Sequence, residues 1–166
     1  MTEAVVAAIG LGSNLSGPAE QVRKAVQALG TDVPKTRLIK ASSLYVSKPQ
    51  GPADQPDYVN ACALVETRLS AEQLLQQLQR LETLQGKIKH RHWGERVIDL
   101  DLLLYGDAVI DLPHLQVPHP WMTRRDFVLK PLAEIAPHLT IPGAGTVIEA
   151  LQALDETYLY DNERPL

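Results

Sequence analysis

Residues 58–86 have the sequence YVNACALVETRLSAEQLLQQLQRLETLQG, in which a strand pattern is followed by a helix pattern. Residues 58–67 are apolar and β-branched enough for a strand, in which alternate side chains point to opposite faces. Ser70 then begins a helix, because Gln73 completes a capping box three residues later. Apolar residues recur on one helical face, namely Leu74, Leu78 and Leu81. The stretch therefore predicts a strand followed by an amphipathic helix that ends at Gly86.

The segments on either side extend this pattern. Residues 5–9 predict a buried strand ended by a glycine turn, and residues 18–29 a helix with Gly30 as its stop. Residues 37–46 and 97–105 predict two more strands. The order of strand, helix, two strands, helix and strand is the split βαβ pattern of an α+β, ferredoxin-like sandwich. We expect a mostly antiparallel sheet with helices packed on one face.

The C-terminal third predicts elements added to this sandwich. A turn at Gly106 precedes a short returning strand at 109–110, and a helix over 123–135 is disturbed at Pro131. Thr146 and Glu149 form a second capping box before a last helix over 147–154. We expect residues 1–166 to form one domain and 155–166 to be a flexible tail.

Composition narrows the class of protein. A net charge of -4 argues against a nucleic-acid binder. Cys62 is the single cysteine, so no intrachain disulfide can form, and its alanine neighbours predict a small buried residue. Neither a signal sequence nor a membrane-length apolar run is present. We expect a cytoplasmic protein without a membrane or obligate protein partner.

Two carboxylates stand out in the strand at 97–105. Asp99 and Asp101 are two residues apart, so both point to one face while Leu100 points to the other. Two adjacent carboxylates repel each other, and a divalent cation relieves that repulsion. Magnesium takes one or two carboxylates and completes its shell with water and phosphate oxygens. The alternative is an ion-pair network with neighbouring arginines.

A basic loop precedes the carboxylate pair. Its cations are Lys87, Lys89, Arg91 and Arg96. Phosphoryl transfer needs carboxylates to hold a metal and cations to neutralise phosphate charge, and this segment supplies both. A solvated surface loop is the alternative, and the sequence leaves open which of the first three cations contacts phosphate.

Aromatic residues make up only 5% of the chain. Tyr58, Trp93 and Phe127 lie beside polar residues and can sandwich a flat heterocycle, although ordinary core packing is the alternative. Asn60 shares a strand face with Tyr58 and offers donors and an acceptor to the edge of such a ring.

His119 lies in a stiff turn between two prolines, and Arg124 and Arg125 lie near a helix start, where anions bind. The alternative is a solvated helix start. Gly10-Leu11-Gly12 lacks the third glycine of a dinucleotide fingerprint, and Gly86-Lys87 lacks the glycine spacing of a P-loop.

Residues 92–103, HWGERVIDLDLL, resemble the signature of the 6-hydroxymethyl-7,8-dihydropterin pyrophosphokinase family. Other segments agree in order: GSNL at 12–15, GPADQPDYVN at 51–60, VPHP at 117–120 and the run 127–137. The resemblance covers about residues 7–154.

This resemblance implies an ATP-dependent and magnesium-dependent diphosphotransferase that acts on a reduced hydroxymethylpterin in folate synthesis. Asp99 and Asp101 would hold two magnesium ions, and they would act with Arg96 as catalytic residues. The residues implied to bind ATP are Gln79, Glu82, Lys87, Lys89, Arg91, Trp93, Arg96, His119 and Arg125. Those implied to bind the pterin are Ser47, Lys48, Gln50, Tyr58, Asn60, Trp93 and Phe127.

Two rival functions remain at this level. A metal-dependent phosphohydrolase would use the same carboxylates and release phosphate or diphosphate without a pterin. A ferredoxin-like regulatory module would bind a small ligand without chemistry, and would need neither the carboxylate pair nor the basic loop. Magnesium-dependent formation of AMP separates the three functions.

Overall fold

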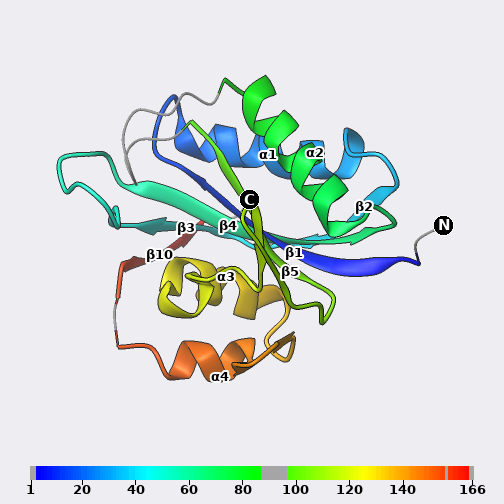
Figure 1. The fold of residues 1–166 in the computed structure, drawn as a ribbon. Helices are drawn as coiled ribbons and strands as arrows, with labels where there is room; N and C mark the ends of the chain where they lie inside the picture. The colour runs from blue at the N-terminus through cyan, green and yellow to red at the C-terminus, as the bar shows by residue number, and fades with distance from the viewer. Residues whose placement is uncertain (1–2, 87–96, 156, 165–166) are drawn as a thin grey trace.

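The computed structural model describes residues 3–86, 97–155 and 157–164. Within this part of the chain six strands form an antiparallel sheet, in the order β10-β3-β4-β1-β5 with β2 also paired to β4 (Figure 1). The strands are β1 (Val5–Ser13), β2 (Thr36–Ala41), β3 (Leu44–Ser47), β4 (Tyr58–Thr67), β5 (Asp99–Tyr105) and β10 (Leu159–Arg164). Every pairing in this sheet is antiparallel, as the sequence predicts.

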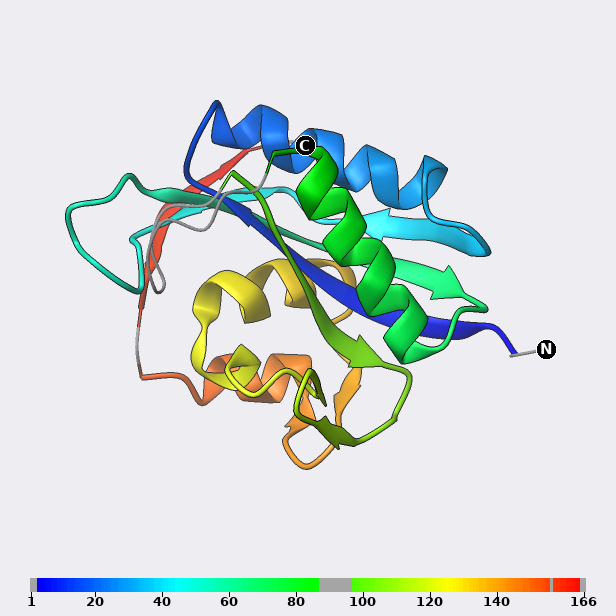
Figure 2. The same cartoon turned by 45° about the horizontal axis from the view of Figure 1, so that its top comes forward.

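Helices cover both faces of the sheet. α1 (Pro18–Thr31) and α2 (Ala71–Leu84) lie on one face, and α3 (Asp126–Ile135) and α4 (Val147–Gln152) lie on the other (Figures 1 and 2). The prediction of helices on one face is therefore wrong for the C-terminal pair. A helix with one apolar stripe must bury it against the sheet, but the stripe does not specify which face it meets.

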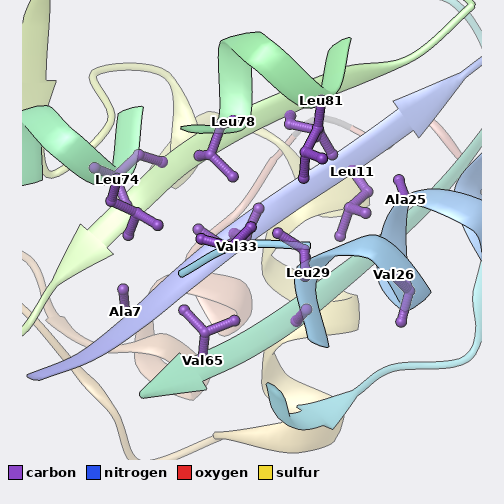
Figure 3. Packing of buried hydrophobic residues seen from close by; sticks show 14 of the residues in the cluster. Ala7, Leu11, Ala25, Val26, Leu29, Val33, Val65, Leu74, Leu78 and Leu81 are labelled. Atoms are coloured by element: carbon purple, nitrogen blue, oxygen red, sulfur yellow. The ribbon is translucent and has the colours of Figure 1, made fainter. Parts of the chain in front are cut away.

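The face under α1 and α2 is closed by apolar side chains. Leu74, Leu78 and Leu81 of α2 meet Val26 and Leu29 of α1 over the sheet (Figure 3). Strand residues such as Ala7, Leu11 and Val65 complete this cluster. Each of these side chains is at most 5% exposed, so this face is a dry core.

Both predicted capping boxes are present. Ser70 accepts the backbone N–H of Gln73, whose side chain accepts the N–H of Ser70. Thr146 and Glu149 make the equivalent pair of bonds at the start of α4. These bonds satisfy helix N–H groups that would otherwise lack an intrahelical partner.

Strands β1, β2 and β3 differ from the prediction in their extent. β1 continues through Gly10 and Gly12 to Ser13, where the sequence predicts a turn. The predicted strand over 37–46 is divided into β2 and β3, and the Ser42 hydroxyl accepts the Cys62 N–H at the interruption.

The helices and the C-terminal end also differ. α1 continues past Gly30 to Thr31, and α3 begins at Asp126 after a 3-10 turn, η1 (Met122–Arg124). α4 ends at Gln152 rather than 154. The predicted tail over 155–166 contains strand β10, which pairs with β3.

Short hairpins complete the fold. The predicted strand at 109–110 begins one residue later as β6 (Ile110–Leu112), which pairs with β7 (Leu115–Val117). β8 (Thr140–Ile141) pairs with β9 (Gly145–Thr146) before α4. Across residues 3–86, 97–155 and 157–164, no helix is long and apolar enough to cross a membrane.

Candidate active site

A pocket lies between the sheet and the N-terminal end of α3. Its enclosed volume is about 120 Å³, and the empty space including its open mouth is about 680 Å³. β1, β4 and β5 supply its floor, and α3 with the residue before it supplies one wall. Its lining is Gly10, Leu11, Gly12, Gln50, Tyr58, Asn60, Ala61, Asp99, Asp101, Arg125, Phe127 and Val128.

Two rows of residues across the sheet build the floor. Gly12 of β1 is opposite Asn60 on β4 and opposite Asp99 on β5. Gly10 is likewise opposite Cys62 and Asp101. Directly opposite residues in antiparallel strands point to the same face. Because β1 has glycine in both rows, no side chain separates the β4 residues from the two carboxylates.

The carboxylate pair has the predicted geometry. Asp99 and Asp101 are half-buried and line the pocket, whereas Leu100 and Leu102 are buried in the α1–α2 core. Among the described residues no group of three His, Cys, Asp or Glu side chains could hold a metal. Two carboxylates beside an open pocket suit magnesium, because water and phosphate oxygens complete its shell. The residues therefore fit the ion that the sequence predicts.

Arg125 connects the carboxylates to the aromatic wall. Burial lowers the pKa of its guanidinium, while Asp101 and Asp99 act in the opposite direction and favour the charged form. The guanidinium lies 5.6 Å from the centroid of the Phe127 ring. A cation in this position could neutralise the charge of a phosphate bound to a metal ion that the two carboxylates would hold.

His119 is held as a neutral imidazole. Burial, with a smaller effect of Arg125, lowers its pKa to about 4. Its Nδ1 accepts the Trp121 N–H at 3.2 Å, so Nε2 carries the remaining hydrogen. Its backbone N–H donates to the Leu103 carbonyl at 2.9 Å, which fixes it to β5. His119 is therefore a hydrogen-bond donor without charge near neutral pH.

Asn60 has a fixed orientation. Its Nδ2 donates to the Ser47 Oγ at 2.8 Å and to the Tyr45 carbonyl at 3.3 Å. Its Oδ1 faces Gly12, since a Cβ built there would lie 3.5 Å from that oxygen. The amide therefore presents an acceptor to the pocket, and buried Ser47 sets this orientation from behind.

The remaining pterin-site residues divide into two groups. Tyr58, Phe127 and Gln50 line the pocket, so two aromatic rings belong to the same cavity as the carboxylates. Lys48 is exposed and outside the lining, and its backbone N–H donates to the Tyr158 carbonyl at 2.8 Å.

The predicted ATP-binding residues are more dispersed. Glu82 is buried and its carboxylate accepts the Leu100 N–H at 2.8 Å, so it holds α2 to the start of β5 beside Asp99. Gln79 is exposed on α2 and does not line the pocket. The other predicted residues lie outside the described part of the chain: Lys87, Lys89, Arg91, Trp93 and Arg96.

Sequence reasoning missed two parts of the site. It interpreted Gly10 and Gly12 as a turn and as a failed dinucleotide motif, and Gly12 as part of the family resemblance. Their alternation in an extended run is instead the signal for a strand with one bare face. It also missed Asp126 and Tyr158, which contact each other beside Phe127. Nothing local in the sequence indicates that pairing.

Cys62 is structural. It is fully buried beneath the site, and its thiol donates to the Val128 carbonyl at 3.4 Å. Burial, with smaller effects of Asp101 and Glu134, raises its pKa well above the ordinary value. It therefore remains a neutral thiol, as its predicted role in the core requires.

Comparison with known proteins agrees with this geometry. A family model described as 7,8-dihydro-6-hydroxymethylpterin-pyrophosphokinase (HPPK) matches residues 8–137. The chain is 48% identical over 148 residues to 2-amino-4-hydroxy-6-hydroxymethyldihydropteridine pyrophosphokinase of Haemophilus influenzae, covering 89% of this chain and 92% of that protein. It is 47% identical over 145 residues to the protein of the same name from Pseudomonas aeruginosa, covering 87% and 89%.

Solved structures support the fold. The crystal structure of wild-type Plasmodium falciparum HPPK-DHPS with pteroate aligns with a TM-score of 0.71 at 14% identity. The alignment covers 92% of this chain and 42% of that longer chain, so this chain spans less than half of it. The family model, in contrast, spans more than half of this chain. The chain therefore belongs to the 7,8-dihydro-6-hydroxymethylpterin-pyrophosphokinase family.

Proposed function

We propose that this chain carries out the reaction for which its family is named. A pyrophosphoryl group passes from ATP to the hydroxymethyl group of 6-hydroxymethyl-7,8-dihydropterin, which gives AMP and the pterin diphosphate for folate synthesis. The observation that carries this proposal is the glycine floor, which is the part of the pocket floor formed by Gly10 and Gly12 of β1. It places a carboxylate pair and an aromatic-lined recess in one cavity.

The pterin half of the pocket suits a flat ring with donors on its edge. Tyr58 and Phe127 offer aromatic surfaces for stacking. The Oδ1 of Asn60 accepts a ring N–H or amino hydrogen, because Ser47 and Tyr45 fix the amide nitrogen on the other side. Gln50 contributes a further polar group at the rim.

The phosphate half of the pocket contains two carboxylates and one guanidinium. Asp99 and Asp101 would hold two magnesium ions, which supply charge neutralisation and polarise the phosphate oxygens when bound. Arg125 lies beside both carboxylates and adds a protein cation to the same region. His119 would donate from Nε2 to a nucleotide oxygen. The family resemblance also assigns Gln79 and Glu82 of α2 to the nucleotide, although neither lines the pocket in this structure.

The chemical step is one displacement. The pterin hydroxyl oxygen bonds to the β-phosphorus, and the bond from that phosphorus to the oxygen bridging the α and β phosphates breaks, so AMP leaves. Asp99 accepts the hydroxyl proton, because it shares its row with Gly12 and Asn60 and is thus adjacent to the pterin half. Positioning and charge neutralisation supply most of the rate.

The basic residues before β5 complete this proposal. Lys87, Lys89 and Arg91 would neutralise the triphosphate, and Arg96 would stabilise the charge that develops as AMP leaves. Trp93 would cover the pterin and exclude water. Exclusion of water is needed because hydrolysis of ATP is the competing reaction.

The test is AMP formation by the purified protein with ATP and magnesium, with and without the pterin. We expect AMP only when both substrates and magnesium are present, and none after chelation of the metal. Phosphate or diphosphate release that is independent of the pterin would indicate a hydrolase instead. Folded protein that forms no AMP under any of these conditions would also contradict the proposal.

A further inference from the structure

A buried carboxylate holds the C-terminal segment against the pocket wall. Asp126 is the first residue of α3 and is 7% exposed. It accepts the backbone N–H of Tyr158 at 3.0 Å and that of Leu159 at 3.1 Å. The helix N-terminus also favours its negative charge. A buried carboxylate with these donors is costly to remove, because the two N–H groups would lose their acceptor.

The same segment also contacts the end of β3. The Tyr158 carbonyl accepts the Lys48 N–H at 2.8 Å, and Leu159 pairs with Ser47 at the end of β3. One short stretch of chain therefore joins the start of α3 to the end of β3. Neither contact belongs to the ferredoxin-like core.

Tyr158 also packs against a pocket residue. Its ring meets the Phe127 ring edge to face, with centroids 5.7 Å apart and planes at 87°. Phe127 also lines the pocket. An edge-to-face neighbour limits how far the Phe127 ring can turn, so the contact affects the surface on which a planar ligand would stack.

We propose that Asp126 and Tyr158 form a clasp that positions Phe127 for the pterin ring. Asp126 fixes the backbone of the C-terminal segment, that backbone fixes the Tyr158 ring, and the ring orients Phe127. Both are positioning residues, since the clasp acts through Phe127 rather than by contact with substrate. The inference rests on the proposed function, because it assigns Phe127 to the pterin.

The first test compares substrate constants of four variants with those of the wild type. Tyr158→Ala and Asp126→Ala should raise the KM and Kd for the pterin about tenfold, which is the effect expected for loss of an aromatic contact. The KM for ATP should change less than twofold. Tyr158→Phe should restore near-normal values, because the ring and the backbone bonds remain.

Glu134→Ala is the matched control. Glu134 is at the other end of α3, where it accepts the Ser43 N–H at 3.0 Å and the Tyr45 hydroxyl at 2.7 Å. It ties α3 to the β2–β3 region without contacting Phe127. Its loss should lower the melting temperature and leave the pterin KM unchanged.

Three outcomes would overturn the clasp in an active wild-type enzyme. The first is an unchanged pterin KM in Tyr158→Ala. The second is an equal rise of the pterin KM and the ATP KM in Tyr158→Ala or Asp126→Ala. The third is a rise of the pterin KM in Glu134→Ala as large as that in Asp126→Ala. Failure of the proposed function would appear differently, as a wild type without pterin-dependent AMP.

A substrate-free measurement tests the structural basis of the clasp. Amide hydrogen exchange at Tyr158 and Leu159 should be at least tenfold faster in Asp126→Ala than in the wild type, with exchange in β4 unchanged. Equal protection in both proteins would show that Asp126 does not hold the segment, whatever the activity.

Discussion

The two faces of the sheet differ in what the same strands present to them. On the α1–α2 face, β1 and β5 contribute Leu11 and Leu100 to a closed apolar core. On the α3 face the same strands contribute Gly12 and Asp99 to an open pocket. Strand alternation therefore lets one segment carry stability on one side and polar chemistry on the other.

The largest expected effect is on the carboxylate pair. Asp101→Ala should lower turnover roughly a hundred- to a thousandfold, the range seen when one preorganised charge-stabilising group is removed. The protein should stay folded, because Asp101 faces the pocket. Steady-state kinetics and a melting curve check both statements, and Asp111→Ala, an exposed aspartate on β6, is the control. Near-normal turnover of the Asp101 variant would remove the metal assignment.

The opposite face should affect stability without affecting chemistry. Leu78→Ala removes a fully buried side chain from α2 and should cost about 2–5 kcal/mol in free energy of unfolding. Well below its melting temperature, kcat and both KM values should match the wild type. Denaturant unfolding measures the loss of free energy of unfolding. The control is Leu84→Ala, which changes an exposed side chain and should lower that free energy little. A selective pterin defect in Leu78→Ala would break the division between the faces.

A graded substitution tests the glycine floor. A Cβ at Gly12 would make only ordinary contacts, 3.5 Å from Asn60 Oδ1 and 3.6 Å from Tyr58, so Gly12→Ala should fold and bind slightly more weakly. Gly12→Val places further methyl groups in the pocket and should weaken pterin binding by about 1–3 kcal/mol, as overpacking does. Titration monitored by pterin fluorescence measures the pterin affinity of both variants. Equal affinity in the three proteins would contradict the assigned position of the ring.

A further expected effect concerns His119 and pH. Its pKa is lowered from 6.5 to about 4 in the folded protein, so the unfolded chain binds more protons between these values. The free energy of unfolding should therefore rise with pH from about 4 to 6.5. His119→Gln should flatten that part of the stability curve, measured by urea unfolding at several pH values. An equal slope in wild type and His119→Gln would contradict the burial of His119.

Local patterns were sufficient for part of the fold. The strand over 58–67, both capping boxes and the shared face of Asp99 and Asp101 are confirmed, because each depends on spacing within one element. The roles of Gly10 and Gly12 depend on register with two other strands, which no local window contains.

Long-range polar contacts explain the remaining misses. β10 exists because it pairs with β3, more than a hundred residues earlier, and its start is held by Asp126. Its sequence has no strong strand pattern of its own, so a flexible tail was the natural expectation. The face occupied by α3 and α4 likewise depends on where the chain crosses the sheet rather than on either helix.

The proposed chemical step is attack of the pterin hydroxyl on ATP in this pocket. Phosphorus-31 NMR of a reaction with ATP, magnesium and pterin carrying oxygen-18 in its hydroxymethyl group tests this directly. We expect AMP and pterin diphosphate in equal amounts, with the label in the bond between the pterin and the first phosphorus. ADP, orthophosphate or a product without the label would contradict it.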